Sequence, residues 1–232
     1  MARIQIGIAC ASVLVLLTVI GCGMGPMGVT GLIIRNAPYF IGYADSYDSQ
    51  VKQLASDHVK EVQVIGRGVR SEASPLIDEF NLTLHAVKFQ QTPFHIVEIG
   101  SIAFSARATE SDVNTFLNQR AHSGKVEVRD IHMSFTPRQV QTTVTIELDG
   151  RAVTAVSTGR LRQEGGTRVI YVPYTFTLDN AALPAAVQQD IVKQLNPVME
   201  LNGLKCIPQI SLITLGEGTA IVTGTAALKN LP

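Results

Sequence analysis

The chain has 232 residues, with 19 Lys and Arg residues against 19 Asp and Glu residues, so its formal net charge is zero. A nucleic-acid-binding surface needs a cluster of excess Lys and Arg, and the sequence contains no such cluster. With 46% hydrophobic and 16% charged residues, the composition excludes a disordered chain and favours one folded domain of medium size, with or without an anchor.

The amino end carries an apolar targeting segment. Residues 4–20 contain no charge and follow Arg3, as in a signal peptide or membrane anchor, so residues 1–21 are assigned to such a segment. The sequence Val19-Ile20-Gly21-Cys22 resembles the lipobox of bacterial lipoproteins, in which cleavage before the cysteine leaves it acylated. Cys22 is therefore the predicted lipidation site. An uncleaved transmembrane helix and a released secreted protein are the alternatives, and all three place the domain outside the cytoplasm, with the first two anchoring it to a membrane of the cell envelope.

Disulfides are permitted outside the cytoplasm, but the sequence does not use them. Cys10 lies in the targeting segment and Cys22 is the acylation candidate, which leaves Cys206 in the domain. One cysteine cannot form an internal disulfide. We expect Cys206 to act as a small buried apolar residue.

The next elements follow from glycine content and from the spacing of apolar residues. Residues 22–42 are rich in glycine and are predicted to form a spacer that leads into a domain over residues 43–232. Tyr47, Val51 and Leu54 recur at spacings near three and four, which predicts a short amphipathic helix over residues 45–58. Apolar and polar residues then alternate, as in half-buried strands, over residues 61–69, 80–89 and 96–106.

A short helix and a series of strands are predicted for the centre of the chain. Thr109 and Asp112 resemble a capping box, and the apolar face that follows predicts a helix over residues 110–119. Asp149-Gly150 and Gly165-Gly166 are hairpin signals, because tight turns between strands require positive φ. The predicted strands of this meander cover residues 126–135, 139–150, 151–164 and 167–178.

The clearest helical pattern lies near the carboxyl end. Leu183, Val187, Ile191 and Leu195 repeat every four residues, with one proline at residue 184 and another at residue 197. Closing strands are predicted at residues 206–215 and 219–228. The whole pattern predicts an α+β fold, in which a strongly curved, mostly antiparallel sheet rolls around one or two helices and follows the amino-terminal anchor segment.

The sequence offers no recognisable catalytic or cofactor-binding motif. It lacks G-x-S-x-G, H-E-x-x-H, G-x-x-x-x-G-K-[ST], C-x-x-C and G-x-G-x-x-G. The five His residues do not share the spacing of metal ligands. We therefore expect no catalytic residue, no metal site and no cofactor.

Two groups of cations are candidates for contacts with lipid phosphates. The first is Arg120, Lys125 and Arg129, and the second is Arg160, Arg162 and Arg168. They could act together if the fold brought them to one rim. The alternative is that these charges simply keep exposed strand ends and loops soluble.

The main feature that remains is the large apolar surface of the strands. A rolled sheet around a helix can enclose an elongated cavity that fits a lipid, whereas an ordinary packed core is the alternative. Residues on the expected inner faces share helical spacing or strand parity. The candidate lipid-binding residues are Phe116, Leu117, Val144, Ile146, Phe176, Leu178, Val187, Ile191 and Leu195.

Two segments resemble a known family. Near the carboxyl end these are Leu195-Asn196-Pro197, Met199-Glu200-Leu201 and Gly203-Leu204, followed by Gly218 and Gly224. Residues 108–117 form the second match, in which a strand runs into a Thr-Glu-capped helix. Both are similar to segments of the LmeA-type phospholipid-binding family, a bacterial branch of the tubular lipid-binding (TULIP) superfamily. The resemblance covers about residues 45–226 and is strong in the second half.

The resemblance implies a non-catalytic binder of phospholipid or another acyl lipid outside the cytoplasm, whose helix and curved sheet enclose the acyl chains and serve envelope lipid homeostasis. Transfer of the lipid is one form of this function. One departure is that the family usually has Leu-Pro and an aromatic residue where this chain has Leu204-Lys205-Cys206, with proline at position 208. A non-catalytic envelope lipoprotein that acts as a scaffold or assembly partner, with a filled core, is the alternative.

Overall fold

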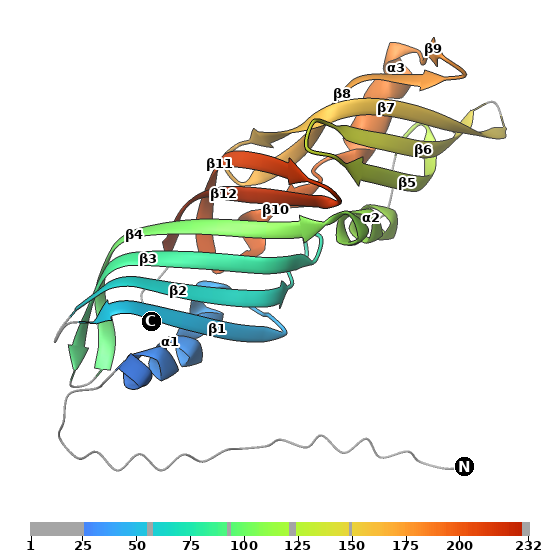
Figure 1. The fold of residues 1–232 in the computed structure, drawn as a ribbon. Coiled ribbons are helices and arrows are strands. Elements are labelled where there is room, and N and C mark those ends of the chain that lie inside the picture. The colour runs from blue at the N-terminus through green and yellow to red at the C-terminus, as the bar shows by residue number, and fades with distance from the viewer. Residues whose placement is uncertain (1–25, 55–57, 92–93, 121–123, 149, 229–232) are drawn as a thin grey trace, which may run out of the picture.

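The computed structural model describes residues 26–54, 58–91, 94–120, 124–148 and 150–228. Within these ranges the strands form two antiparallel sheets that follow each other along an elongated molecule (Figure 1). The first sheet has the spatial order β1 (Ser46–Leu54), β2 (His58–Val69), β3 (Ile77–Gln91), β4 (Phe94–Thr109), β12 (Thr219–Leu228), β11 (Cys206–Gly216). The second has the order β10 (Met199–Glu200), β8 (Arg168–Leu178), β7 (Arg151–Glu164), β6 (Val140–Leu148), β5 (Glu127–Phe135), with β9 (Ala181–Ala182) paired to β8.

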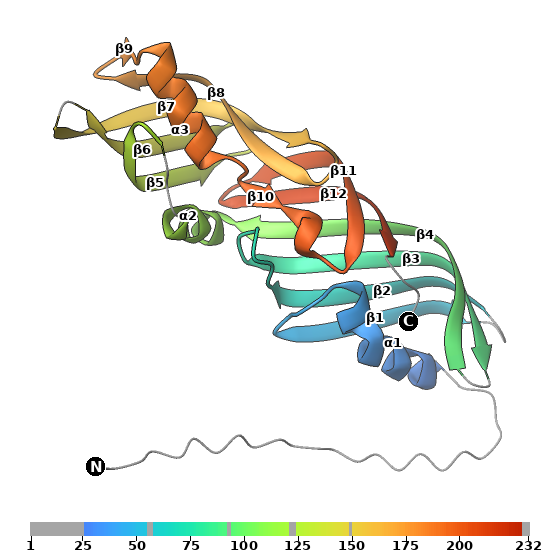
Figure 2. The ribbon, with the colours of Figure 1, turned by 180° about the vertical axis from the view of Figure 1, so that it is seen from behind.

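Helices α1 (Pro26–Phe40) and α3 (Ala185–Leu195) cover the same side of the sheets, as the view from behind shows (Figure 2). Helix α2 (Glu110–Gln119) connects the first sheet to the second, and a short 3-10 turn, η1 (Leu201–Gly203), follows β10. The predicted α+β class with mostly antiparallel strands is confirmed. The strands divide into two sheets, whereas the sequence predicts one.

The inner face of the first sheet is apolar because alternate side chains of its long strands point to the same side. On β2 and β3 the side chains of Val62, Val64, Leu82 and Leu84 are fully buried. The ring of Phe80 stacks on the ring of Phe104 in β4, with the ring centroids 5.8 Å apart. This face forms the core of the first sheet.

Helix α1 lies in the segment that the sequence predicts to be a glycine-rich spacer. Its residues Ile33, Ala37 and Phe40 are buried, and it packs on β1 and β2. The structure therefore corrects the spacer for residues 26–40, which form a helix that covers the first sheet. Three or four apolar residues on one helical face are enough to dock a helix on a sheet, even where glycines lower its intrinsic helix propensity.

The helix predicted over residues 45–58 is wrong, because residues 46–54 form strand β1. A spacing of four, as between Tyr47 and Val51, fits both a helical face and the alternation of a strand. Ser49, which lies between them, distinguishes the strand from the helix. Its side chain is buried on the same face, and its hydroxyl donates a hydrogen bond to the Thr30 carbonyl of α1.

The other predicted elements agree closely with the structure. The Thr109 hydroxyl accepts a hydrogen bond from the Asp112 amide at 3.2 Å and so caps α2 as predicted. Gly150, Gly165 and Gly166 all have positive φ in the hairpin turns, whereas Asp149 lies outside the described residues. The remaining strands and α3 overlap the predicted ranges, and the closing strand at residues 219–228 has its predicted bounds.

Backbone hydrogen bonds join the two sheets where β11 and β12 meet the second sheet. The Ile210 amide donates to the Gly166 carbonyl at 2.6 Å, and the Gly218 amide donates to the Phe135 carbonyl at 3.1 Å. The first residue of α2, Glu110, donates its amide to the Gly218 carbonyl at 2.8 Å. The sheets are thus coupled through the β11–β12 hairpin and α2.

Candidate functional site

The candidate lipid-binding residues all face the interior, as predicted. Leu117, Val144, Ile146, Phe176, Ile191 and Leu195 are fully buried, and Phe116, Leu178 and Val187 are partly buried. Those on β6, β8 and α3 belong to the second sheet and the helix that covers it. The two on α2 lie at the junction of the sheets. Their contact with a lipid stays a prediction.

The prediction omitted the inner face of the first sheet. Val62, Val64, Phe80, Leu82 and Phe104 form an equally apolar surface there. The signal was present in the alternation of β2, β3 and β4, but the sequence does not say that this face lies on the same side as α3. The apolar interior therefore extends beyond the nine predicted residues.

Polar side chains of α3 hold that helix across the second sheet. The Gln188 side-chain oxygen accepts a hydrogen bond from the Phe176 amide of β8 at 3.0 Å. Farther along the helix, Asp190 accepts from the Val126 amide at 2.8 Å, and Gln194 donates to the Val126 carbonyl at 2.9 Å. These bonds fix the helix at both sides of the sheet, so Ile191 between them faces the strands.

Three hydroxyl groups lie within the apolar interior of the second sheet. Thr142 and Tyr171 are fully buried, Ser157 is 3% exposed, and Thr142 pairs with Ser157 across β6 and β7. Burial raises the pKa of the Tyr171 phenol, and the hydroxyls of Ser157 and Thr142 oppose this shift. Gly159 leaves room for the Tyr171 ring, because a Cβ atom at that position would lie 2.7 Å from it.

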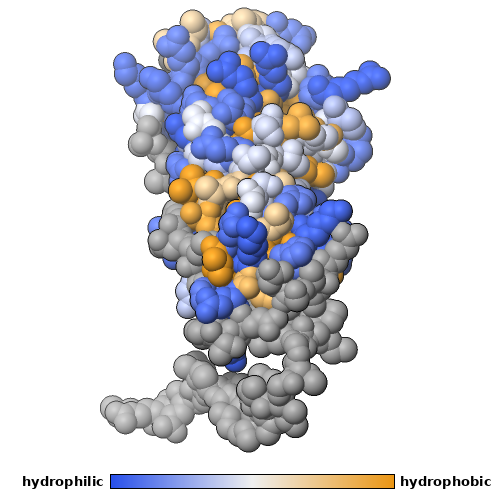
Figure 3. All heavy atoms as spheres, turned by 90° about the vertical axis from the view of Figure 1, so that its left-hand side faces the viewer, coloured by the Kyte–Doolittle hydropathy of each residue, from blue (hydrophilic) through white to orange (hydrophobic). Residues whose placement is uncertain are grey.

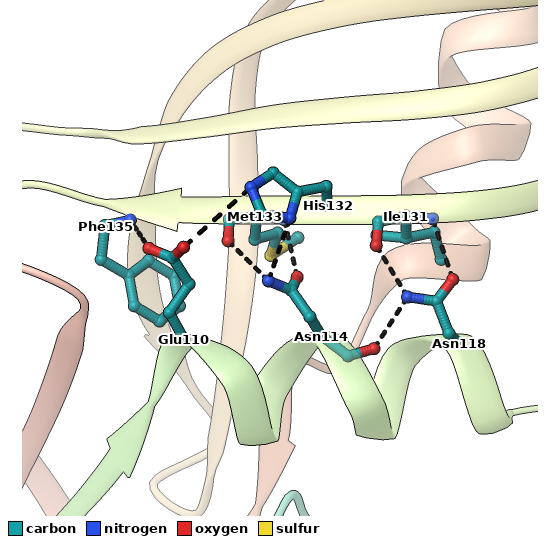
Figure 4. Close-up of polar contacts among 7 residues, drawn as sticks. All are labelled: Glu110, Asn114, Asn118, Ile131, His132, Met133 and Phe135. Atoms are coloured by element: carbon teal, nitrogen blue, oxygen red, sulfur yellow. Dashed lines mark hydrogen bonds and ion pairs between the residues drawn. The ribbon is translucent and has the colours of Figure 1, made fainter.

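The outer edge of β5 is sealed by side chains of α2 (Figure 4). Asn114 accepts from the Met133 amide at 2.7 Å and donates to the Met133 carbonyl at 2.9 Å. Asn118 makes the same two bonds with Ile131, at 2.9 and 2.7 Å. Four helical residues rise about 6 Å, close to the rise of about 6.7 Å for two strand residues. Residues four apart on α2 therefore match alternate residues of β5.

Glu110 continues this series by one helical turn toward the start of α2. Its carboxylate accepts a hydrogen bond from the Phe135 amide at 2.9 Å. The exposed side chain of His132 points to the same helix, with Nε2 4.0 Å from the Glu110 carboxylate. These three side chains bind backbone amides of β5 where a neighbouring strand would otherwise pair. We call Glu110, Asn114 and Asn118 the amide-edge ladder.

The side chain of Asn196 binds backbone groups on the edge of β8 in the same way. Its side chain accepts from the Tyr171 amide at 2.7 Å and donates to the Tyr171 carbonyl at 3.0 Å. Backbone pairing by β10 continues the same edge, with Met199 opposite Val169. Asn196 and β10 together therefore cover the backbone groups along this edge of β8.

Arg120 connects α2 to that same motif. Its guanidinium donates to the Pro197 carbonyl at 2.6 Å and to the Asn196 carbonyl at 3.1 Å, and it lies 5.4 Å from the centre of the Phe116 ring. Burial lowers the pKa of Arg120, and Glu200 opposes this shift. Arg120 is therefore bound within the junction, and Arg129 is paired with Glu127 and Glu147 on the surface. Both are already engaged by groups of the chain.

A cleft of about 340 Å³ opens at the junction of the two sheets. It lies between α2 and the segment that connects β2 to β3. Phe116, one of the candidate residues, lines it together with Leu76 and Pro75, while Arg70, Ser71, Ser74, Asp112, Thr115 and Gln119 supply the polar part of its wall. The cleft could accept a group that is polar on one side and apolar on the other.

A second groove, of about 420 Å³, lies at the far end of the first sheet. It separates β4 from β12, because their pairing ends at Ala103 and Thr225 although both strands continue. Apolar side chains dominate its wall: Val97, Ile99, Ile102, Ala226 and Leu228. From the side that includes this end, apolar patches appear between hydrophilic residues (Figure 3).

The described residues contain no group of three or more His, Cys, Asp or Glu side chains placed to hold a metal ion. Cys206 is fully buried on β11, as expected for a small apolar residue. Among the helices of the described residues, none is long and apolar enough to cross a membrane. The apolar segment 4–20, Cys10 and Cys22 lie outside the described residues.

A family model described as LmeA-like phospholipid-binding matches residues 50–225. The chain belongs to the LmeA-like phospholipid-binding family. The match runs from within β1 to within β12 and includes the whole second sheet and all nine candidate residues. Searches of curated proteins and of solved structures give no match.

The two sequence segments that resemble the family have a common structural role. The segment at residues 108–117 contains Glu110 and Asn114 of the amide-edge ladder, and the carboxyl-terminal segment contains Asn196. Each of these residues satisfies backbone groups on an outer strand of the second sheet. The segments therefore complete the sheet that carries most of the candidate lipid-binding residues.

Proposed function

We propose that the protein binds phospholipid, or another acyl lipid, in its apolar interior and performs no catalytic step. The observation that carries this proposal is the family match over residues 50–225. The acyl chains would lie between the sheets and the helices that cover them, along an elongated cavity. Transfer of lipid between membranes is one form of this function and would serve lipid homeostasis of the cell envelope.

The energetics of acyl-chain burial are adequate for such a binder. Each buried CH₂ group contributes about 0.8 kcal/mol, so a chain of sixteen carbons offers about 12 kcal/mol. Capture costs an estimated ~4–15 kcal/mol in lost motion of the two partners. One acyl chain can therefore offset the cost, and a diacyl lipid exceeds it.

The same proposal places the protein outside the cytoplasm, tethered to a membrane of the envelope. The support is the uncharged segment 4–20 followed by the lipobox-like Cys22. Acylation at Cys22 and an uncleaved helix are two routes to the same location. Mass measurement of the amino-terminal peptide distinguishes them, because a diacylglycerol adduct appears on Cys22 in the first case.

A scaffold with a filled core is the second candidate function. The observation in its favour is that Ile191, Leu195 and Val144 are fully buried by other residues of the chain. A core at the usual packing density of about 0.74 has no room for an acyl chain. The two candidates differ in whether the interior between α3 and the second sheet opens.

Native mass spectrometry of the full chain, with lipid identified after organic extraction, tests the proposal directly. We expect a bound lipid, or uptake of a fluorescent acyl probe by the extracted protein. A lipid-free chain that takes up no probe would overturn the proposal. The full chain is required, because removal of residues 1–34 would delete more than half of α1, including the buried Ile33.

Ile191→Trp separates the two candidate functions. If the interior opens for lipid, the indole occupies that space, so probe uptake falls while the melting temperature changes little. If the site is permanently packed, overpacking costs about 1–3 kcal/mol of unfolding free energy with no separate loss of uptake. Lys193→Trp, at an exposed position of the same helix, is the matched control and should change neither quantity.

A further inference from the structure

Helix α1 runs antiparallel to β1, which fixes where the chain enters the domain. The end of α1 leads within a few residues to the start of β1 at Ser46. Thr30, near the start of the helix, accepts a hydrogen bond from Ser49 farther along the strand. Pro26 therefore lies toward the end of β1, at the pole of the first sheet where β3 ends and β4 begins (Figures 1 and 2). We call this the anchor pole.

The distance from the anchor pole to a membrane is short if the proposed anchoring holds. Four residue steps separate Cys22 from Pro26, and they span about 14 Å when fully extended. For an uncleaved helix that ends at Ile20, the limit is about 20 Å. In either case the start of α1, and with it the anchor pole, must lie near the membrane surface.

The β3–β4 hairpin bends at this pole. Ala86 has a positive φ of 52°, and the register shifts between Lys88 and Phe89. Lys88 pairs with Glu98 before the shift and Phe89 pairs with Ile96 after it, which leaves Val97 as the extra residue. A bulge of this kind kinks a strand and redirects a side chain. Val97 is 51% exposed on a strand whose neighbour Ile96 is buried.

The hairpin also extends beyond its neighbours. Pairing of β3 with β2 ends at Lys88 and His58, and pairing of β4 with β12 ends at Ala103 and Thr225. The apolar groove of about 420 Å³ starts at this point and runs to the pole. Val97 and Leu228 mark its outer part. An exposed strand edge next to an apolar groove is unusual for a surface in water.

The charged residue that lines the groove, Glu98, is paired within the protein, and so is Lys52 on the far side of the same pole. Lys52 pairs with Glu61 and Lys88 pairs with Glu98, both at 2.7 Å. Such exposed pairs leave little net charge to attract anionic lipid headgroups. Apolar contact is therefore the main interaction that the groove offers to a partner.

We propose that the anchor pole docks on the bilayer to which the chain is tethered, with Val97 in the interfacial region and the β4–β12 groove open to the membrane. This inference rests on the proposed anchoring. An apolar group at the interface is stabilised by burial at the boundary of the acyl chains. Docking at this pole places the interior of the first sheet next to its lipid source.

The sequence has no Trp, so Val97→Trp introduces a single reporter into the full chain. The variant is reconstituted into vesicles of phosphatidylcholine that carry bromine on the acyl chains. We expect blue-shifted emission and loss of about half of it by bromine quenching, as for a residue about 5–10 Å into the interface. Addition of phosphatidylglycerol should change the quenching little, because Glu98, the charged residue that lines the groove, is paired with Lys88.

Tyr174→Trp is the matched control, since Tyr174 is 69% exposed on β8 of the other sheet. Its emission should stay that of a solvent-exposed indole in the same vesicles. Equal quenching at both positions, or no quenching at position 97, would overturn the docking. A shift at position 97 that grows with protein concentration and does not respond to bromine would assign the groove to a second copy of the chain.

Vesicle flotation and probe uptake distinguish failure of this inference from failure of the proposed function. A chain that floats with the vesicles but shows no quenching at position 97 is anchored without docking at this pole. A chain that does not float overturns both the anchoring and the docking. Quenching at position 97 without any lipid uptake would uphold docking and overturn the proposed lipid binding.

Discussion

Two strand edges of this molecule differ in how their backbone groups are treated. On β5, side chains of Glu110, Asn114 and Asn118 bind the amides of three alternate residues, and the two asparagines also bind two carbonyls. On β4, pairing with β12 ends at Ala103, and the strand continues to the pole beside an apolar groove. Among the described residues, one edge is closed by side chains and the other is open.

The contrast suggests that the two edges have different roles, one in stability and the other in function. An open edge is a template for aggregation, so proteins usually cover it. Here the β5 edge is covered by side chains of α2. The open edge lies at the anchor pole, where a membrane would cover it. We therefore expect changes at the β5 edge to affect stability and changes at the β4 edge to affect membrane contact.

The largest effect is expected from the combined change Asn114→Leu and Asn118→Leu. It leaves the amides and carbonyls of Ile131 and Met133 without their side-chain partners, and each unsatisfied buried group costs about 1–3 kcal/mol. We expect the unfolding free energy to fall by about 3–5 kcal/mol, together with greater self-association through β5. Urea unfolding followed by far-ultraviolet circular dichroism measures the first effect, and light scattering measures the second.

Ser111→Ala is the control for that pair, because Ser111 is exposed on the same helix. It should change the unfolding free energy by less than about 0.5 kcal/mol. If the double variant lost no more than the control, solvent would be satisfying the β5 edge and the comparison between the edges would fail.

Asn196→Ala is expected to have the next largest effect. It removes both side-chain bonds to Tyr171 on the β8 edge, which should cost about 1–3 kcal/mol of unfolding free energy. Asn202→Ala is a matched control, because Asn202 is exposed and bonds to the Glu200 carboxylate. Equal urea midpoints for the two variants would contradict a sealing role for Asn196.

Glu110→Gln sharpens the description of the sealed edge. The amide oxygen of Gln can still accept the hydrogen bond from Phe135, so the change should cost less than about 1 kcal/mol, which is the advantage of a charged acceptor. Glu110→Ala removes the acceptor and should cost more. Equal losses for the two variants would show that the negative charge, for example in its approach to His132, matters more than the acceptor oxygen.

Val97→Asp is expected to have the smallest effect on stability. The side chain is half exposed at a bulge, so the unfolding free energy should change by less than about 0.5 kcal/mol. Membrane contact of the pole should nevertheless be lost, because a carboxylate resists transfer into the interface. Hydrogen exchange of β4 amides in vesicle-bound protein measures this, with protection expected in the unmodified chain and not in the variant.

The accuracy of the sequence predictions varied with the kind of pattern. Long alternating runs such as those in β7 and β12 were placed within a residue, and the Thr109 cap was located correctly, because both signals are local. Strand β1 was predicted as a helix, since Tyr47 and Val51 satisfy both periods. Helix α1 was missed, because glycine content suggested a spacer while three apolar residues on one face were enough to dock it.

The candidate site shows the same division. Strand parity and the four-residue repeat predicted that Ile191, Phe176 and Val144 face inward, and the structure confirms it. The same patterns could not predict that Gln188, Asp190 and Gln194 of that helix bind backbone groups of the second sheet. Nor could they predict that Phe116 would line a cleft between the sheets instead of the space beneath α3.

The sequence by itself determined the apolar faces of the strands, the caps, the hairpin turns and the resemblance to a phospholipid-binding family. These depend on spacing over a few residues, where backbone geometry alone relates position to direction. Tertiary structure decided that the strands form two sheets and that α2 and Asn196 close two strand edges. It also decided that, within the part of the chain that the structure describes, β4 is open at the anchor pole. Whether a strand edge is covered depends on which distant segment reaches it, and periodicity carries no information about that distance.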